Sequence, residues 1–215
     1  MKSFLIVGAG TLGHHLVEEF EKLNCETMVV DMNEPSLQDL MDIATSCRIA
    51  DCTNEEALRS LGVDSFDCCF VCVGGNFQQS LVITSALKEN GAKKVYALAD
   101  EDVQAKFLLR NGADEVIFPQ RDVCRNIALS ESSDSLFDCI RLTEDYGVYE
   151  IEPLRTWIGK SLRTAQIRNT HGLMVLAVKR NGSIEMQPDA DYVIGAGDHL
   201  LVLGKEDMVK KVAIR

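Results

Sequence analysis

The sequence predicts an α/β protein in which a Rossmann-like, doubly wound parallel sheet is followed by a smaller α+β domain. Short apolar runs alternate with helix-length segments up to about Phe118, the pattern of parallel strands joined by crossover helices. A glycine-rich turn follows the first of these runs. Beyond Phe118 the alternation gives way to strand patterns punctuated by glycine, so we expect a second domain within the 215 residues.

Six apolar runs in the first part of the chain are interpreted as strands. They contain few polar residues, as expected of strands that helices cover on both faces. The expected strands are residues 4–7, 27–31, 47–50, 68–73, 95–99 and 115–118.

The segments between these strands carry helix signals. Thr53 and Glu56 have the spacing of a capping box, which predicts a helix that starts near Asn54. Gly91 and Gly112 follow two further helical segments, at the position where a left-handed cap favours glycine. A stripe of apolar side chains predicts that the first helix faces the sheet. The stripe consists of Leu12, Leu16, Phe20 and Leu23.

The C-terminal part begins with a helix and continues as a small mixed domain. Pro119 precedes a helical segment, residues 122–136, so we expect a crossover linker there and divide the chain into residues 1–119, 120–138 and 139–215. The pair Asn181-Gly182 predicts a two-residue hairpin turn. The other expected elements are strands at 147–151, 173–179, 183–187 and 198–204, a short helix at 161–168 and a closing helix at 205–212.

Charge and hydropathy argue against two classes of partner. Because 22 Lys and Arg stand against 33 Asp and Glu, the net charge of −11 repels phosphate backbones, and we expect no nucleic-acid partner. Glycine and charged residues break every apolar stretch short of the roughly 18 residues that span a bilayer. We therefore expect a cytoplasmic protein with a mature N-terminus and no direct membrane insertion.

The eight cysteines and four histidines match no metal or redox arrangement. Most of the cysteines lie in strand-like runs, which favours reduced thiols in the cytosol. Cys69 and Cys72 match the C-x-x-C pattern, but the two-residue period of a strand sends their side chains to opposite faces. No cluster of His and Cys has ligand spacing, so we expect no metal site.

A candidate nucleotide site begins at the first strand-to-helix turn. The run Gly8-Ala9-Gly10-Thr11-Leu12-Gly13 matches G-x-G-x-x-G in the structural context that gives this pattern meaning. Glycines let backbone N–H groups and the positive end of the helix face a phosphate. Asp31 ends the second strand, where a carboxylate accepts hydrogen bonds from both ribose hydroxyls and disfavours the 2′-phosphate of NADP. The alternative is a plain tight turn, with Asp31 capping the next helix.

Two further segments lie at the carboxyl ends of strands, the edge at which open α/β sheets bind ligands. One follows the third strand and the other the fourth, and their alternative roles are helix capping and a plain glycine turn. Together with the first turn, they give the candidate nucleotide-binding residues Gly8, Gly10, Thr11, Leu12, Gly13, Asp31, Met32, Asp51, Cys52, Val73, Gly74, Gly75 and Asn76.

In order and spacing these segments resemble the regulatory subunits of Ktr and Trk potassium-uptake systems, the TrkA/KtrA family of RCK (regulator of potassium conductance) proteins. The resemblance covers essentially the whole chain. It also includes residues 50–53 in place of the family's G-D-A-T, residues 74–78, the turn at 111–114, Pro119 before the linker helix, and the hairpins after Leu173.

The resemblance implies an RCK N-terminal domain that binds NAD(H), ADP, AMP or ATP, followed by a C-terminal RCK (TrkA-C) domain. It implies a regulatory subunit without enzymatic activity, whose homodimers assemble into a ring, an octamer. This ring would gate an integral-membrane potassium channel or transporter and would be peripheral to the membrane through that partner. A ligand can shift such a ring only through unequal affinity for its two shapes.

Three positions depart from the family pattern. Thr11 stands where many relatives have an arginine, and Leu98 where many have Arg or Lys. The lost positive charge favours AMP, ADP or NAD(H) over a triphosphate. Gln120 replaces a glutamate suited to a divalent ion between subunits, which argues against activation by Mg²⁺ or Ca²⁺.

In some relatives the C-terminal domain binds cyclic di-AMP at its dimer interface. The comparable residues of this chain are Ile167, Arg168, His171 and Pro188. Arg168 would pair with a phosphate, and the alternative is a solvated surface arginine.

Two other functions remain open on the sequence alone. An NAD-dependent dehydrogenase needs a general acid or base near the nicotinamide, and His171 and His199 show no partner pattern for that role. A stand-alone NAD(H) or adenine-nucleotide sensor without a transporter fits the same residues.

Overall fold

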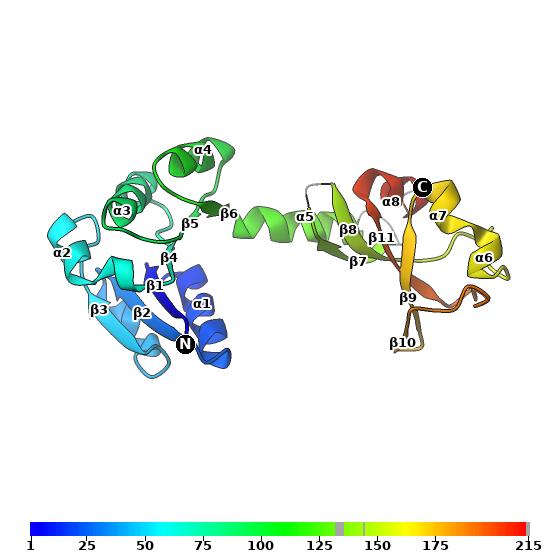
Figure 1. Cartoon of the computed structure of the whole chain (residues 1–215), viewed down its shortest axis with the longest axis horizontal. Coiled ribbons are helices and arrows are strands. Elements are labelled where there is room, and N and C mark those ends of the chain that lie inside the picture. The colour runs from blue at the N-terminus through cyan, green and yellow to red at the C-terminus, as the bar shows by residue number, and fades with distance from the viewer. Residues whose placement is uncertain (132–135, 144, 214–215) are drawn as a thin grey trace. The chain divides into compact units, whose positions relative to one another are not determined.

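The structure of the protein is a computed structural model that describes residues 1–131, 136–143 and 145–213. The chain divides into two compact units, Met1–Arg121 and Asp122–Arg215 (Figure 1). The boundary between them falls within helix α5 (Pro119–Glu131). Among the described residues, no helix combines the length and the apolar character needed to cross a bilayer.

Unit 1 contains a six-stranded, all-parallel sheet. Its strand order is β3-β2-β1-β4-β5-β6, so the direction of the connections reverses between β1 and β4. The six predicted strands are confirmed, with ends shifted by one or two residues. They are β1 (Ser3–Val7), β2 (Glu26–Asp31), β3 (Ser46–Ile49), β4 (Cys68–Val71), β5 (Val95–Leu98) and β6 (Glu115–Ile117).

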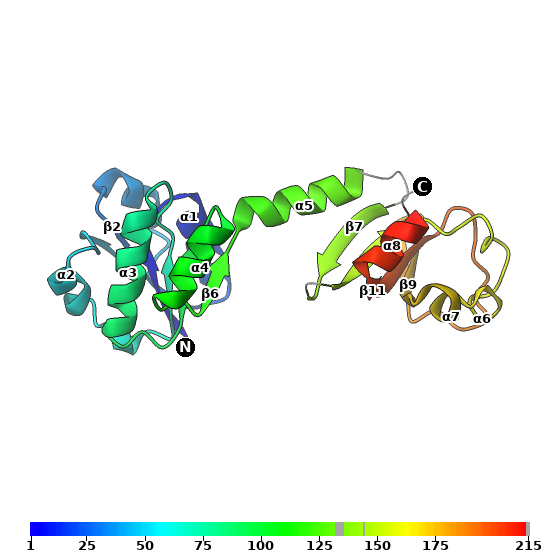
Figure 2. The same cartoon turned by 90° about the horizontal axis from the view of Figure 1, so that it is seen from above.

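Helices cover both faces of this sheet (Figure 2). Successive strand residues alternate between two cores: Leu5 packs in one and Ile6 in the other. Cys69 and Cys72 also belong to different cores, which confirms that the C-x-x-C pair faces opposite sides. The elements on one face are α1 (Thr11–Lys22) and the 3₁₀ helix η1 (Glu34–Leu40), and those on the other are α2 (Glu55–Ser60), η2 (Val63–Ser65), α3 (Phe77–Glu89) and α4 (Asp102–Arg110).

Two helix predictions in unit 1 need correction. Leu23 does not face the sheet: it is 68% exposed, because it is the C-cap of α1 and its backbone leaves the helix there. Thr53 does not cap α2 either. Asn54 does so, and its side chain accepts hydrogen bonds from the backbone of Glu56 and Ala57. The predicted caps at Gly91 and Gly112 are confirmed by φ angles of 84° and 113°.

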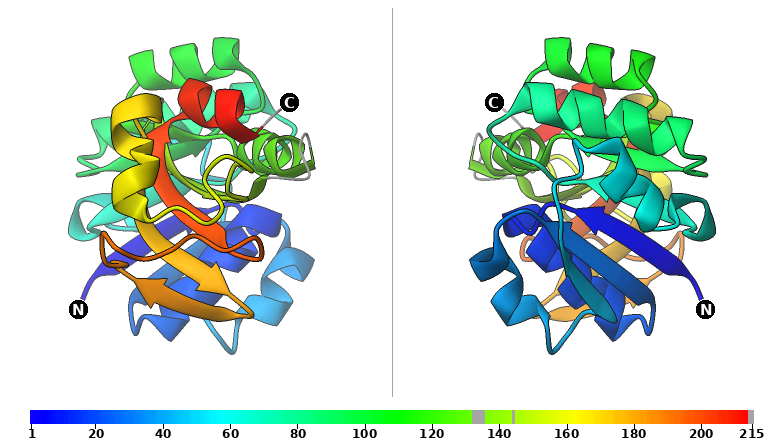
Figure 3. Two further views of the ribbon diagram at one scale, coloured as in Figure 1. Left: turned by 90° about the vertical axis from the view of Figure 1, so that its right-hand side faces the viewer. Right: turned by 90° about the vertical axis from the view of Figure 1, so that its left-hand side faces the viewer.

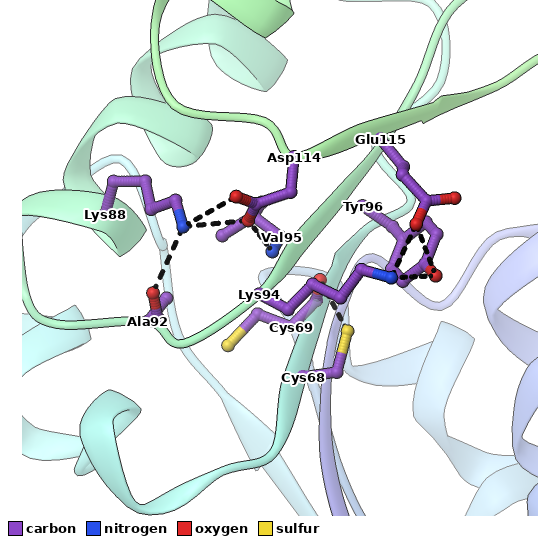
Figure 4. A network of polar contacts seen from close by, with 9 residues as sticks. All are labelled: Cys68, Cys69, Lys88, Ala92, Lys94, Val95, Tyr96, Asp114 and Glu115. Carbon is purple, nitrogen blue, oxygen red and sulfur yellow. Dashed lines mark hydrogen bonds and ion pairs between the residues drawn. The ribbon is translucent and has the colours of Figure 1, made fainter.

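A polar network ties the amino ends of β5 and β6 to α3 (Figure 4). The Asp114 carboxylate accepts hydrogen bonds from Lys88 Nζ at 3.0 Å and from the Val95 backbone N–H at 2.7 Å. Nearby, Lys94 donates to Tyr96 Oη at 2.7 Å and forms an ion pair with Glu115 at 2.5 Å. These contacts fix the edge of the sheet opposite the strands' carboxyl ends.

Unit 2 is an antiparallel five-stranded sheet with strand order β10-β9-β11-β8-β7, covered on one face by short helices (Figure 3). The predicted Asn181-Gly182 hairpin joins β9 to β10, with φ angles of 52° and 80°. The elements are β7 (Leu136–Arg141), β8 (Tyr146–Ile151), α6 (Leu162–Ala165), α7 (Ile167–His171), β9 (Met174–Arg180), β10 (Ser183–Met186), β11 (His199–Lys205) and α8 (Glu206–Ala213).

Two predictions in this part are also wrong in extent. The helix expected over residues 122–136 runs over Pro119–Glu131 instead, and Leu136 begins strand β7; residues 132–135 lie outside the described part. The single helix expected over 161–168 is two short helices, because Gln166 adopts a left-handed backbone with φ 47° between them.

Candidate nucleotide site

A cleft of about 240 Å³ opens at the carboxyl ends of the strands of unit 1, where the strand order reverses. This is the location at which open α/β sheets bind ligands. Four chain segments and two helices contribute to it. Its lining is Val7, Gly8, Ala9, Gly10, Val30, Asp31, Met32, Ser36, Ala50, Asp51, Cys52, Thr53, Cys72, Val73, Gly74, Gln79 and Ile83.

The three glycines of the first turn have different physical roles. Gly8 has φ 103°, and a Cβ there would lie 2.9 Å from the carbonyl carbon and oxygen of Cys72. A Cβ on Gly13 would lie 2.1 Å from the carbonyl oxygen of Gly8, so this glycine lets α1 pack against the turn. Gly10 is different, because the nearest atom to a Cβ there is 3.8 Å away. Gly10 is therefore the glycine whose missing side chain leaves room for a ligand.

Helix α1 starts at the rim of this cleft without a side-chain cap. Gly10 is its N-cap residue, no side chain accepts a hydrogen bond from the first turn, and no acidic residue lies in that turn. The first N–H groups of a helix have no partner within the helix, and they carry its partial positive charge. The end of α1 can therefore receive an anion.

Asp31 accepts hydrogen bonds from two backbone N–H groups beside the cleft. Its Oδ2 accepts a hydrogen bond from the Ala9 N–H at 2.8 Å, which holds the glycine turn against β2. Its Oδ1 accepts one from the Asn33 N–H at 2.8 Å, at the start of η1. Because a carboxylate oxygen can accept two hydrogen bonds, Asp31 keeps acceptor capacity toward the cleft that it lines.

The segment after β3 presents one carboxylate and one thiol to the cleft. Thr53 donates to Asp51 Oδ1 from its hydroxyl at 2.7 Å and from its backbone N–H at 2.9 Å, and these bonds lower the pKa of Asp51. Burial and the neighbouring carboxylates of Asp51 and Asp31 raise the pKa of Cys52 to about 12. Burial raises the pKa of Cys72 to about 12 as well. Both thiols are therefore protonated at neutral pH and act as apolar walls.

The other predicted residues occupy several positions around the cleft. Met32, Val73 and Gly74 line it. Gly75 lines a neighbouring cavity, and Asn76 caps α3 by accepting a hydrogen bond from the Gln79 N–H at 3.1 Å. Thr11, Leu12 and Gly13 form the first turn of α1 and do not line the cleft, although their backbone belongs to the uncapped helix end.

Several lining residues were not among the predicted ones. Ala9 lies between the predicted glycines, and Thr53 directly follows the predicted Asp51 and Cys52 in the same segment. Ser36, Gln79 and Ile83 come from η1 and α3 and reach the cleft only through the packing of these helices on the sheet. Of these three, only Gln79, in the first turn of α3, has a signal in the sequence, because the glycine run before it places that helix end at the cleft.

A smaller cavity of about 140 Å³ shares Val73 with the cleft and lies at the carboxyl ends of β4 and β5. Leu98, one of the three departures from the family pattern, contributes an apolar wall to it. The full lining is Val73, Gly75, Phe77, Ser80, Leu98, Asp100 and Gln104.

The two cavities are electrostatically acidic. None of the described residues that line them is Lys, Arg or His, whereas Asp31, Asp51 and Asp100 are carboxylates. A phosphate there would meet neutral hydrogen-bond donors and no cationic side chain of the lining, so a ligand with few negative charges fits best. Gln120 is exposed near the start of α5, and no cluster of three or more potential metal ligands occurs in the described ranges.

In unit 2, the predicted second-messenger residues are only partly brought together. A groove of about 440 Å³ runs along α6, α7 and the start of β9, and Ile167 and Arg168 line it. His171 does not, and its ring packs edge-on against Trp157 at a centroid distance of 5.2 Å. Pro188 is also absent from this groove.

Comparison with known proteins identifies the family. Residues 4–119 match the TrkA-N domain and residues 148–213 match the TrkA-C domain. Ktr system potassium uptake protein C of Bacillus subtilis is 32% identical over 94% of this chain and 92% of its own length. Ktr system potassium uptake protein A of the same organism is 30% identical over 98% and 95%.

The fold has counterparts among solved structures. The GsuK channel bound to NAD aligns with 96% of this chain at a TM-score of 0.68 and 18% identity. The alignment covers 38% of the GsuK chain, so this chain corresponds to less than half of that protein. The two matched domains and the sequence identity of 30% to 32% over nearly the full length agree with the fold. The chain therefore belongs to the family of TrkA-N and TrkA-C domain proteins that includes the Ktr potassium-uptake regulatory proteins.

Proposed function

We propose that this protein is a nucleotide-binding regulatory subunit of a potassium-uptake system, and that it binds an adenine nucleotide in the cleft at the carboxyl ends of β1–β4. The observation that carries this proposal is that one cleft is bordered both by the carboxylate of Asp31 and by the uncapped N-terminus of α1. Backbone N–H groups at the helix end would hold the phosphates, and Asp31 would accept hydrogen bonds from the ribose.

The chemistry of the lining favours a sensor over a dehydrogenase. Among the described residues, neither cavity is lined by a His, Lys or Tyr that could exchange a proton with a substrate beside the nicotinamide. The two thiols at the cleft are protonated at neutral pH. Nucleotide binding would then shift the equilibrium between two shapes of the protein and would not promote a reaction.

The partner follows from the family. The relatives at 30% and 32% identity are named for potassium uptake by the Ktr system, and they match this chain over nearly its full length. The protein would act as a ring of homodimers at the cytoplasmic face of an integral-membrane potassium channel or transporter. Nucleotide binding would gate that partner by favouring one shape of the ring.

The groove in unit 2 is the candidate place for cyclic di-AMP. It is lined by two guanidinium groups: Arg163 pairs with Asp191 at 2.9 Å, whereas Arg168 forms no ion pair in the described part of the chain. Titration of the protein with cyclic di-AMP tests this role. An Arg168→Ala variant that binds the ligand as well as the wild type would contradict it.

The nucleotide site is tested by calorimetry with ADP on the full chain. Asp31→Ala is expected to weaken binding by roughly 1.5 to 3 kcal/mol, the value of hydrogen bonds to a charged acceptor. Asp39→Ala is the matched control, because it removes the same charge from an exposed position of the same unit that does not line the cleft. Equal ADP binding by all three proteins would refute the site.

The transport role is tested in the host. Deletion of the gene is expected to reduce potassium uptake. Expression of the Asp31→Ala variant in the deletion strain should supply the subunit again but should not restore control of uptake by the nucleotide. Uptake that is unchanged by the deletion would exclude the role in transport and leave the nucleotide site in place.

A further inference from the structure

We propose that the smaller cavity, at the carboxyl ends of β4 and β5, binds one end of a short aliphatic diamine such as putrescine, and that this cation strengthens nucleotide binding in the adjacent cleft. The diamine site stands on the lining of the cavity alone, whereas the coupling to the nucleotide rests on the proposed function. The inference adds a second ligand and a way to regulate the nucleotide site.

Ser80 gives the cavity a buried polar group that no other residue uses. The residue is 2% exposed, and its hydroxyl has no hydrogen-bond partner in the described part of the structure. Buried polar groups are almost always satisfied, and an unsatisfied one costs stability. The cavity volume of about 140 Å³ is many times the roughly 10 to 15 Å³ that one water molecule needs. The cavity is therefore large enough for a small organic group.

The polar lining offers hydrogen-bond acceptors and negative charge. The Asp100 carboxylate only accepts hydrogen bonds, and none of the described lining residues is a cation. Gln104 Oε1 accepts one hydrogen bond, from the Asp100 backbone N–H at 2.9 Å, and an amide oxygen has a second lone pair. Ser80 Oγ can accept as well. An ammonium group, which has three N–H donors and a positive charge, matches this set of acceptors.

The other walls of the cavity are apolar and select an organic cation. Val73, Phe77 and Leu98 contribute these walls. An alkyl chain gains free energy when such walls remove it from water. Hard inorganic cations take oxygen ligands instead and gain nothing from the three apolar side chains. A primary amine is protonated at neutral pH, as the lysine side chain with its pKa of about 10.4 is, so an alkylammonium group fits both kinds of wall.

The cavity opens toward the nucleotide cleft with little between them. Val73 lines both, and the next two residues are Gly74, at the cleft, and Gly75, at the smaller cavity. A Cβ on Gly75 would meet no atom within 4 Å, and one on Gly74 would meet a single atom, at 4.0 Å. A chain of a few methylene groups can therefore pass over this glycine pair and carry a second ammonium group into the cleft.

A second ammonium group would supply the positive charge that the cleft lacks. Asp31 and Asp51 line the cleft, and none of its described lining residues is Lys, Arg or His. Nucleotide phosphates would therefore face carboxylates without a balancing cation. A bound diamine reduces this repulsion, and each ligand must then raise the affinity of the other by the same factor. One charge pair at a partly exposed site corresponds to a factor of roughly 2 to 5.

Calorimetry of the full chain with putrescine, at constant ionic strength, tests the site. Because the net charge of −11 also attracts cations to the surface, matched variants are needed. Asp100→Asn should weaken putrescine binding at least about fivefold, and Ser80→Ala should weaken it roughly 3- to 10-fold. Glu101→Gln is the control and should bind as the wild type does, because Glu101 is exposed and lines neither cavity.

Two monovalent probes test the apolar walls. Butylammonium and methylammonium carry the same charge, and butylammonium should bind at least about tenfold more tightly because more of its methylene groups are buried. K⁺ at the same concentration should not displace it. Equal binding of butylammonium, methylammonium and K⁺ would show a general counterion site and would overturn the proposal.

The coupling is measured by titrating ADP with and without saturating putrescine. ADP binding should tighten roughly 2- to 5-fold, whereas the binding of adenosine, which has no phosphate, should stay the same. Asp100→Asn should lose this tightening. An ADP affinity that does not respond to bound putrescine would overturn the coupling.

The outcomes separate this inference from the proposed function. If the wild type binds ADP but no putrescine, or if folded Asp100→Asn and Ser80→Ala bind putrescine as the wild type does, the diamine site is overturned and the nucleotide site stands. If ADP does not bind under any condition, the proposed function and the coupling fail, and the two variants still decide the diamine site. Folding is checked by melting temperature, and that of Ser80→Ala should equal or exceed the wild-type value because a buried unpaired hydroxyl has been removed.

Discussion

At the scale of single residues, the glycines of the first turn show how one sequence pattern contains separate requirements. Gly13 is required by packing, since a Cβ would lie 2.1 Å from the Gly8 carbonyl oxygen, whereas the space beside Gly10 is open. The pattern G-x-G-x-x-G does not distinguish the glycine that packing requires from the glycine that leaves space open. Only the packing of α1 against the turn shows that the fold requires Gly13 and that the space beside Gly10 stays open at the cleft.

This difference predicts opposite behaviour for two substitutions. Gly13→Ala is expected to destabilise the protein by about 1 to 3 kcal/mol through overpacking against backbone. Gly10→Ala should change the free energy of unfolding by less than about 1 kcal/mol but weaken ADP binding at least about tenfold, because its methyl group enters the space for the phosphate. Urea unfolding and calorimetry measure the two effects. A Gly10→Ala protein that binds ADP normally would place the phosphate elsewhere.

The cysteines give a second prediction at this scale. Cys124 is exposed on α5, whereas Cys52 and Cys72 are buried at the cleft with pKa values raised to about 12. Because the thiolate is the reactive form, iodoacetamide at neutral pH should alkylate Cys124 in the native protein well before the other two. Peptide mass spectrometry reads out each site, and labelling in urea, where all three should react, is the control. Fast native labelling of Cys52 would show that burial does not protect it.

The cap of α2 shows where local spacing stops being informative. Thr53 and Asn54 are both suitable N-cap residues, and the capping-box spacing favours Thr53. In the structure the Thr53 hydroxyl is bound to Asp51 at 2.7 Å, so Asn54 takes the cap. The carboxylate that accepts the Thr53 hydrogen bond belongs to Asp51, a residue of the candidate site. The capping-box spacing of Thr53 and Glu56 contains no information about this competing hydrogen bond.

At the scale of elements, the parallel strands were predictable because each is a short apolar run that needs no distant information. The errors lie where backbone conformation changes locally. Gln166 adopts a left-handed conformation that splits one expected helix into α6 and α7. Leu23 continues the apolar stripe of α1 in sequence but follows the end of the helix. Periodicity describes a helix interior, and its ends are decided by caps.

The contact between α3 and the amino ends of β5 and β6 gives a pH prediction. Burial opposes ionisation of Asp114, but hydrogen bonds from Lys88 and Val95 outweigh it and lower its pKa. A lowered carboxylate pKa contributes stability that is present above the unfolded pKa, about 3.9, and is lost as the pH falls through the folded pKa.

The measurement compares the wild type with Asp114→Asn by urea unfolding between pH 3 and 7. The variant should be less stable by about 1 kcal/mol near pH 7, a value reduced for solvent screening because both side chains of the ion pair are about one-third exposed. The difference should begin to shrink below about pH 4, where the Asp114 carboxyl of the unfolded chain takes up a proton before that of the folded protein. A difference that stays constant down to pH 3 would show that packing, not charge, accounts for it.

At the scale of the whole molecule, the sequence located the first cleft but not the second cavity. The cleft is built from chain segments that directly follow apolar strands, so position along the chain is enough to find them. Ser80 and Gln104 lie inside α3 and α4, where neither residue departs from an ordinary helical pattern. Their convergence depends on how two helices pack on one sheet face, which is a property of the folded unit.

The two units have separate hydrophobic cores, and a ligand in unit 1 should therefore stabilise that unit alone. Trp157 is the single tryptophan of the chain, is 3% exposed, and belongs to the core of unit 2, so its fluorescence reports the unfolding of that unit. At an ADP concentration of about 100 times the dissociation constant, the calorimetric transition of unit 1 should gain about 2.7 kcal/mol, while the Trp157 transition stays in place. Asp31→Ala, with ADP binding weakened by roughly 1.5 to 3 kcal/mol, should cut this shift to about half or less at the same ADP concentration. A Trp157 transition that moves with ADP would mean that the cores unfold together, and nucleotide binding would then be coupled to the stability of unit 2 within a single chain.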